Sequence, residues 1–245
     1  MKLLHLYHDV MNLYGEYGNI LMLTRMLEKN GIVCELDRLS IEDKVEVQNY
    51  DFIYMGSGTE RNQKQVLTHM KLLKEELQNY IEAGKVLLMT GNSFELLGKQ
   101  IMDASGTKWE GLGIFPFEVR EQNRTRNTAD AVFTMEELEH PLVGFINKCS
   151  TIEGVDIPLF KVEMGLGNTG QGGREGVRFH NFFGTHLTGP LLVKNPYFLI
   201  YLASVLCKKA PLDSSWMEYE KAAYEVTLRE LGKRLAQIEG KNKQG

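Results

Sequence analysis

Cysteine is the side chain best suited to nucleophilic or metal chemistry, and the sequence holds three: Cys34, Cys149 and Cys207. A thiolate attacks carbonyl groups and binds zinc, but both uses need partner residues at suitable spacing. The three cysteines form no C-x-x-C pair, and none has a histidine at a zinc-ligand spacing. We interpret them as reduced thiols with a structural role, and we expect no metal and no cofactor.

A second candidate for chemistry is the glycine-rich segment Gly165–Gly173 (GLGNTGQGG), which holds five glycines. Such a segment is either a surface loop or a cradle whose backbone amides hold a phosphate. It lacks the Lys-Ser/Thr ending of a P-loop, and no G-x-G-x-x-G fingerprint follows a predicted strand with the proper downstream acid. The pattern therefore favours a surface loop.

The whole chain has the size and balance of a globular α/β protein. Its 245 residues are 43% hydrophobic, enough for one large domain or two small ones. A net charge of −4 argues against a nucleic-acid-binding surface. The amino terminus is too polar for a signal peptide, and no stretch approaches the roughly 20 apolar residues that cross a bilayer. We expect a cytoplasmic protein without a membrane span.

Apolar runs alternate with amphipathic helical stretches in the first part of the chain. This rhythm of strand, helix and strand is typical of a parallel sheet covered by helices on both faces. The expected strands are Leu3–Tyr7, Ile32–Leu36, Asp51–Met55 and Val86–Met89. The expected helices carry Ile20, Leu23 and Leu27 before Gly31, and Val66, Met70, Leu73, Leu77 and Ile81 before Gly84.

The second part of the chain predicts antiparallel strands and two more helices. The strand candidates are Gly111–Val119, Ala129–Thr134 and Phe160–Met164. Asn195 and Pro196 are a natural start for a helix through Cys207. The last helix has an apolar stripe that packs on the domain or in a partner's groove: Met217, Tyr224, Leu228, Leu231, Leu235 and Ile238. We expect one domain over residues 1–210, followed by an amphipathic helix and tail over 211–245.

Four separated segments together resemble a known family. They are Asn12-Leu-Tyr-Gly-Glu-Tyr-Gly-Asn-Ile20, Gly56-Ser-Gly-Thr-Glu-Arg-Asn-Gln63, Gly91-Asn-Ser-Phe-Glu-Leu-Leu-Gly98 and Gly184-Thr-His-Leu-Thr-Gly-Pro190. In this order the chain resembles the class I glutamine amidotransferases of the cobyric acid synthase type. Within that family it is most similar to the glutaminase subunits of lipid II isoglutaminyl synthases. The resemblance implies a three-layer α/β sandwich with a mostly parallel sheet and a flavodoxin-like core.

The resemblance also implies a cysteine nucleophile, which this chain lacks. The family carries C-G-G-x-Q-x-L-G on a sharp strand-to-helix turn, where a thiolate attacks the glutamine carboxamide. The position of that cysteine is Gly91, and the position of the glutamine is Glu95. A register shifted by one residue would place Thr90 there instead.

The general base that the resemblance implies is missing as well. The family has L-H-G-P where this chain reads Leu187-Thr188-Gly189-Pro190, so Thr188 stands at the histidine position. His186 lies two residues earlier, and in a strand it would share a face with Thr188. It either approaches the site or is a buried structural histidine. The loss of both partners predicts an inactive dyad.

Some of the binding apparatus that the resemblance implies is present. Gly56, Ser57 and Gly58 match the loop whose backbone N–H groups help to form the oxyanion hole, although their glycines also suit an ordinary turn. Arg126 falls where the family has an arginine for the glutamine α-carboxylate; otherwise it is a solvent-facing arginine, with Arg124 as the alternative in a shifted register. We expect these segments to line one pocket that lacks a thiol near its centre.

Three functional hypotheses follow. The first is a family member without conventional glutaminase activity, which binds glutamine or another amide, or associates with a Mur-ligase-like synthetase subunit. The second is an active amidotransferase that uses Ser93 or Thr90 as nucleophile with His186 as base. The third is a small-molecule-binding module that shares only the fold.

Overall fold

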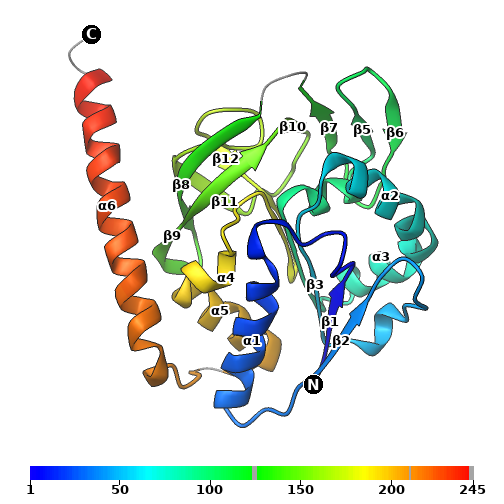
Figure 1. The fold of residues 1–245 in the computed structure, drawn as a ribbon, viewed down its shortest axis with the longest axis horizontal. Coiled ribbons are helices and arrows are strands. Elements are labelled where there is room, and N and C mark those ends of the chain that lie inside the picture. Colours follow the sequence, from blue (N-terminus) through cyan, green and yellow to red (C-terminus); the bar gives the residue numbers. More distant parts are fainter. Residues whose placement is uncertain (123–125, 210, 243–245) are drawn as a thin grey trace.

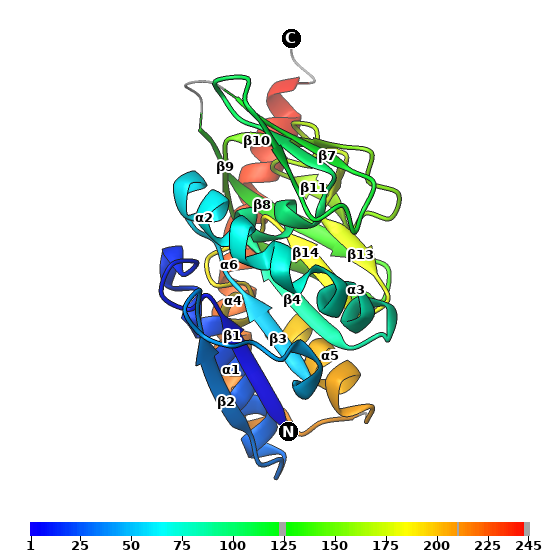
Figure 2. The same cartoon turned by 90° about the vertical axis from the view of Figure 1, so that its right-hand side faces the viewer.

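A six-stranded sheet lies at the centre of the molecule (Figures 1 and 2). The structure is a computed structural model that describes residues 1–122, 126–209 and 211–242, with side chains as far as residue 237. The strand order is β13-β14-β4-β3-β1-β2, and only β13 runs antiparallel to its neighbour. The core order 2-1-3-4 followed by β14 is that of a flavodoxin-like sheet. The strands are β1 (Lys2–Leu6), β2 (Glu35–Leu39), β3 (Phe52–Met55), β4 (Val86–Thr90), β13 (Val177–Phe179) and β14 (Phe182–Thr185).

Helices cover both faces of this sheet and complete the predicted three layers. One face packs against α1 (Tyr17–Lys29), α4 (Leu191–Lys194) and α5 (Pro196–Cys207); the other packs against α2 (Glu60–Met70) and α3 (Lys74–Glu82). Side chains alternate along β3, so that the sheet is apolar on both faces. Phe52 packs in the core beneath α1, α4 and α5, and Ile53 packs in the core beneath α2 and α3. The predicted fold class is confirmed.

Two predicted elements of the first half have different bounds. The second strand begins at Glu35 rather than at Ile32, because Gly31 has a positive φ of 75° and the Ile32 N–H still donates to Leu27 O at 3.0 Å, which caps α1. The single helix expected through Ile81 is two helices, α2 and α3, joined by the short 3₁₀ turn Lys71–Leu73.

The second half adds two small sheets, whereas the sequence predicted antiparallel strands without assigning them to separate sheets. One has the order β10-β7-β5-β6 and the other β12-β11-β8-β9. The strand predicted over Gly111–Val119 is wrong for most of its length: it is a loop between β6 and β7, in which Gly111 approaches Gly98 O too closely for any Cβ. The strands are β5 (Gln100–Met102), β6 (Lys108–Glu110), β7 (Glu118–Glu121), β8 (Asn127–Met135), β9 (Leu138–Lys148), β10 (Ser150–Glu153), β11 (Phe160–Met164) and β12 (Arg174–Glu175).

The glycine-rich segment between β11 and β12 folds on itself. Gly167 N–H donates to Gly170 O at 2.6 Å, and the buried Lys148 ammonium donates to Gly167 O at 2.5 Å. An added Cβ at Gly167 would lie 2.2 Å from Gly172 O. The glycines therefore serve close packing of the backbone rather than a phosphate cradle.

The last helix, α6 (Glu218–Asn242), stands at one side of the molecule in Figure 1. Its stripe packs on β8 and β9, where Tyr224 and Leu231 contact Val132 and Val143. Tyr224 Oη also donates to Pro141 O at 2.7 Å. This part of the stripe is covered by the domain, as one of the two interpretations predicted. In the described ranges, no helix combines the length and apolar character needed to cross a bilayer.

Candidate functional site

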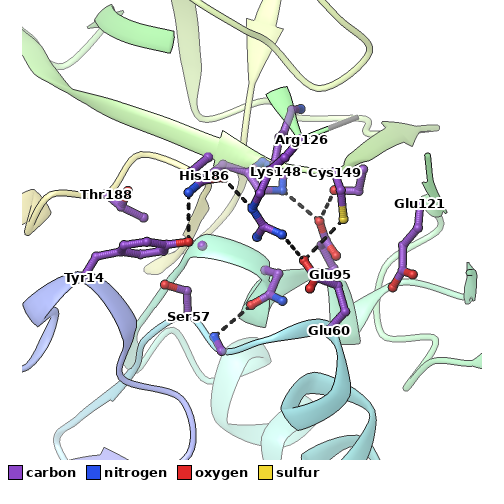
Figure 3. Close-up of a pocket in the computed structure, with 15 residues that line it drawn as sticks. Tyr14, Ser57, Glu60, Glu95, Glu121, Arg126, Lys148, Cys149, His186 and Thr188 are labelled. Atoms are coloured by element: carbon purple, nitrogen blue, oxygen red, sulfur yellow. Dashed lines mark hydrogen bonds and ion pairs between the residues drawn. The ribbon is translucent and has the colours of Figure 1, made fainter. Parts of the chain in front are cut away.

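A small pocket lies at the carboxyl ends of β3, β4 and β14, where ligands bind in sheets of this type (Figure 3). Its volume is about 10 Å³, which is room for about one water molecule. The pocket brings together residues from several predicted segments: Ser57, Gly58, Gly91, Asn92, Arg126, His186 and Thr188. Gly56, Thr90 and Ser93 lie behind this wall and do not line it.

Gly91 begins the 3₁₀ helix Gly91–Leu97 directly after β4, at the turn where the family resemblance implies a nucleophile. Its φ is +66°, a conformation that favours glycine. An added Cβ at this residue would lie 2.1 Å from Ser57 Cβ and 2.7 Å from Ser57 Oγ. The Ser57 side chain therefore fills the space that any side chain at residue 91 would need.

Ser57 belongs to a buried hydrogen-bond network centred on Glu16. Glu16 Oε2 accepts from Ser57 N at 2.9 Å, Ser57 Oγ at 3.1 Å and Thr90 Oγ1 at 2.7 Å. Burial raises the pKa of Glu16 to about 7, and these hydrogen bonds oppose the rise. Glu16 stands in the first of the four quoted segments, but its residue type alone gave no reason to place it under the pocket.

Replacing Glu16 with glutamine changes the pH dependence of stability. The folded pKa of Glu16, about 7, lies above its ordinary 4.5, so the folded state holds the extra proton between these values and loses stability as pH rises through 7. Urea unfolding at pH 4.5 and at pH 8 measures the difference in the free energy of unfolding between Glu16→Gln and wild type. Between pH 4.5 and pH 8 this difference should change in favour of the variant by roughly 2 to 3 kcal/mol. An unchanged difference between the two pH values would contradict this prediction.

The comparison needs the variant because His5 works in the opposite direction over the same range. Burial lowers the pKa of His5 to about 4, below its ordinary 6.5. The unfolded state holds the extra proton between these values, so His5 adds stability as pH rises through this window. The wild-type profile alone would hide both effects.

Neither proposed substitute nucleophile is hydrogen-bonded to His186 in this structure. Ser93 is fully buried, and its hydroxyl donates to Thr90 O at 2.8 Å and Met55 O at 3.2 Å. Thr90 Oγ1 donates to Glu16. Both hydroxyls therefore stabilise the turn after β4, and a pairing of either with His186 stays a prediction.

His186 lies between two buried carboxylates. Its Nε2 is 2.9 Å from Glu95 Oε1, and its Nδ1 is 3.1 Å from Glu175 Oε1. Glu95 also accepts from Ser150 Oγ and from Gln63 Nε2, while Thr185 Oγ1 donates to Glu175 Oε2 at 2.6 Å. Side-chain exposure is 2% for His186 and Glu95 and 0% for Glu175. His186 is thus buried and held by two carboxylates, and it also lines the pocket.

Thr188, at the position of the missing base, supports the backbone. It forms an antiparallel bridge with Phe145, and its hydroxyl donates to Phe145 O at 3.0 Å. A threonine hydroxyl has no neutral-pH base to offer. Thr188 lines the pocket but supplies it with no proton acceptor of the kind the family's histidine would provide.

Arg126 lies on the pocket, but its guanidinium is already engaged. Its Nη1 donates to Glu60 Oε1 at 2.8 Å and its Nε donates to Asn147 Oδ1 at 2.6 Å. In the predicted oxyanion loop, Gly58 N–H donates to the carboxamide oxygen of Asn92 at 3.0 Å. Roles for Arg126 and Gly58 in glutamine binding remain predictions, and Arg124 lies outside the described residues.

A thiol does line the pocket, although none was expected near its centre. It belongs to Cys149, which joins β9 to β10. Its Sγ donates to Glu60 Oε1 at 3.3 Å, and burial together with this carboxylate raises the pKa of the thiol to about 12. A thiol held protonated beside a carboxylate is a poor nucleophile. The other two cysteines are also free of disulfides.

Comparison with known proteins agrees with this architecture. The model of the CobB/CobQ-like glutamine amidotransferase domain matches residues 2–196. The chain is 32% identical over 211 residues to the lipid II isoglutaminyl synthase (glutamine-hydrolyzing) subunit GatD of Streptococcus pneumoniae, covering 85% of this chain and 81% of that protein. It is 29% identical to the subunit of the same name from Staphylococcus aureus, covering 85% of each.

Solved structures add the fold alone. A glutamine amidotransferase from Thermotoga maritima superposes with a TM-score of 0.54 at 14% identity, covering 96% of this chain and 97% of that one. A second glutamine amidotransferase gives 0.52, also at 14% identity, covering 84% and 98%. The likeness to the two GatD subunits extends to sequence, so the hypothesis of a shared fold alone does not hold. The chain belongs to the family of CobB/CobQ-like glutamine amidotransferase domains.

Proposed function

We propose that this chain is a glutamine amidotransferase-like subunit of the lipid II isoglutaminyl synthase type that has no cysteine-dependent glutaminase activity. It associates with a Mur-ligase-like synthetase, as the similarity to GatD subunits suggests. Its part in peptidoglycan precursor amidation is to stabilise or position that partner rather than to release ammonia from glutamine.

The observation that carries this proposal is the identity of the residues at the turn after β4 and at the position of the family's base. Gly91 has no group that attacks a carboxamide, and the space beside it is filled by Ser57. Thr188 supplies no imidazole, and the thiol of Cys149 donates to Glu60. Loss of nucleophile and base together removes the covalent step and the roughly 10² to 10⁴-fold contribution of general base catalysis.

A second observation disfavours retained glutamine binding. The guanidinium of Arg126 holds the Glu60 carboxylate, Gly58 N–H holds the Asn92 carboxamide, and the remaining volume is about 10 Å³. The protein's own groups thus occupy the places where an α-carboxylate and an amide would bind. We place the subunit in the cytoplasm, a location supported by its three unpaired cysteines.

Reconstitution with the synthetase tests this function. We expect the tagged chain to co-purify with a Mur-ligase-like protein, and the complex to amidate its cell-wall precursor with ammonium chloride but not with glutamine as nitrogen source. The matched control omits ATP, because ligase chemistry needs it whichever nitrogen source is used. Amidation that proceeds equally well with glutamine would contradict the proposal, as would a complex that does not form.

A further inference from the structure

Ser57 sits on a second strand-to-helix turn, between the end of β3 at Met55 and the start of α2 at Glu60. The glycines on either side of it allow a close backbone approach: an added Cβ would lie 2.6 Å from Met11 O at Gly56 and 2.3 Å from Met11 Sδ at Gly58. A tight turn from strand to helix is where α/β hydrolases present a nucleophilic serine. The position of Ser57 is therefore one from which a hydroxyl can face a substrate.

The Ser57 hydroxyl also occupies the right place in the pocket. Ser57 lines the pocket although only 3% of the residue is exposed, and its Oγ is 2.7 Å from the point where a side chain at Gly91 would begin. The hydroxyl is thus adjacent to the position at which the resemblance implies a nucleophile. Figure 3 shows Ser57 among the side chains that line the pocket.

A proton acceptor lies beside this hydroxyl. Ser57 Oγ is 3.1 Å from Glu16 Oε2, which is within hydrogen-bond reach. The pKa of Glu16, about 7, suits a general base that works at neutral pH. Glu16 is fully buried, and its second oxygen, Oε1, has no hydrogen-bond partner among the described residues. Its Oε2 is held beside the Ser57 hydroxyl by the hydrogen bonds from Ser57 N and Thr90 Oγ1.

A donor for the developing oxyanion follows in the chain. The backbone N–H of the residue after a nucleophile commonly fills this role, and here that residue is Gly58. Gly58 N–H already donates to a carboxamide oxygen, Asn92 Oδ1, at 3.0 Å. The Nδ2 of the same amide is buried and has no partner in the described part of the chain. A substrate carbonyl oxygen can replace Asn92 Oδ1 without breaking a second hydrogen bond of that side chain.

The geometry points to Ser57 as a serine nucleophile toward small acyl compounds, with Glu16 as its general base and Gly58 N–H as its oxyanion donor. Ser57 Oγ bonds to the carbonyl carbon of a small ester while its proton passes to Glu16 Oε2. The alcohol leaves with that proton, giving an acyl-serine. Water then attacks, Glu16 takes and returns its proton, and the carboxylic acid departs. Ester and water thus give acid and alcohol, with no other reactant.

The size of the pocket sets the class of substrate. The pocket of about 10 Å³ holds about one water molecule, so even an acetyl group enters only when the Asn92 side chain turns away. A glutamine side chain with its α-carboxylate would also require Arg126 to release Glu60. This inference goes beyond the proposed function and does not depend on it, since it concerns neither glutamine nor the synthetase.

The test uses the full chain with p-nitrophenyl acetate, quenched in acid before digestion. We expect one acetylated peptide, the one that contains Ser57, and release of nitrophenol that falls about 100-fold in Ser57→Ala and in Glu16→Gln. Ser93→Ala is the matched control, because its hydroxyl lies in the neighbouring turn but donates to backbone carbonyls; labelling and turnover should stay within about twofold of wild type. Labelling that disappears in Cys149→Ala instead would overturn the assignment.

Two further outcomes are informative. If Ser57→Ala unfolds, Ser57→Cys keeps the shape of the side chain, and iodoacetamide should alkylate the new thiol faster than Cys149. Folded wild type that takes up no acetyl group at Ser57 would overturn the proposal. Because these reagents involve no glutamine and no partner, that failure would leave the co-purification and amidation results of the proposed function unaffected.

Discussion

Replacing Gly91 with cysteine should lower the free energy of unfolding by about 3 kcal/mol and restore no glutaminase activity. The new Cβ would lie 2.1 Å from Ser57 Cβ, at a φ of +66° that side chains rarely adopt. Crowding of a packed core costs roughly 1 to 3 kcal/mol, and a left-handed backbone about 1 to 2 more. Urea denaturation monitored by circular dichroism measures the loss.

The loss of stability in Gly91→Cys should depend on the side chain of Ser57. In Gly91→Cys/Ser57→Gly the overlap disappears, so most of the crowding cost should be recovered, about 2 kcal/mol relative to the single variant. Gly91→Cys/Ser57→Ala is the matched control, because alanine keeps the Cβ that clashes and should recover little. Equal stability of the three cysteine variants would show that Ser57 does not fill the nucleophile's space.

Replacing His186 with leucine should cost about 3 to 5 kcal/mol, because it leaves Glu95 and Glu175 buried without the group that lies between them. The ring contacts one carboxylate with each of its nitrogens, and leucine offers neither a donor nor an acceptor in their place. The same unfolding measurement applies, and a loss below about 1 kcal/mol would contradict this interpretation of the cluster.

Glu95→Gln provides the control for that prediction. Glutamine is the residue that the family resemblance implies at this position, and its amide can still bond to Ser150 and to the His186 ring. It also removes one buried carboxylate, so its cost should be about 1 kcal/mol or less. The contrast between the two variants separates loss of the central imidazole from loss of a single hydrogen bond.

The central sheet could be predicted from sequence because its strands are short apolar runs between amphipathic helices. Val86–Met89 is buried at every position and matches β4 to within one residue. The two small sheets of the second half were harder to predict. Their strands pair across loops, as when β8 and β9 form a hairpin and β10 joins β7, and half-exposed patterns such as that of Glu118–Glu121 carry little periodicity.

The pocket was predictable where sequence order and sheet topology fix a position. The loops after Met55 and Thr90 meet because β3 and β4 pair in parallel, and the residues after Thr185 join them because β14 pairs with β4. Cys149 could not be placed in the pocket from sequence, because its position depends on how the β9–β10 connection packs against the turn at Gly91. Glu16 and Glu175 were missed for a similar reason: burial decides their importance, and a lone acid gives no sign of it.

Three side chains of the protein fill space or form contacts around the pocket. Ser57 fills the space beside Gly91, Asn92 Oδ1 accepts from Gly58 N–H, and Glu60 holds Arg126. Each contact is satisfied within the chain, which explains the small volume of the pocket. Under the proposed function, the architecture of the family is retained while its substrate site is filled.

Formation of glutamate from glutamine by the purified chain, alone and with its synthetase partner, tests this account most directly. With neither thiol nor imidazole in the places where the family uses them, the rate should equal that of buffer within error over hours. Glutamate that forms at a measurable rate, and ceases to form in Cys149→Ala, would contradict it, since the chain would then have moved its thiol chemistry rather than lost it.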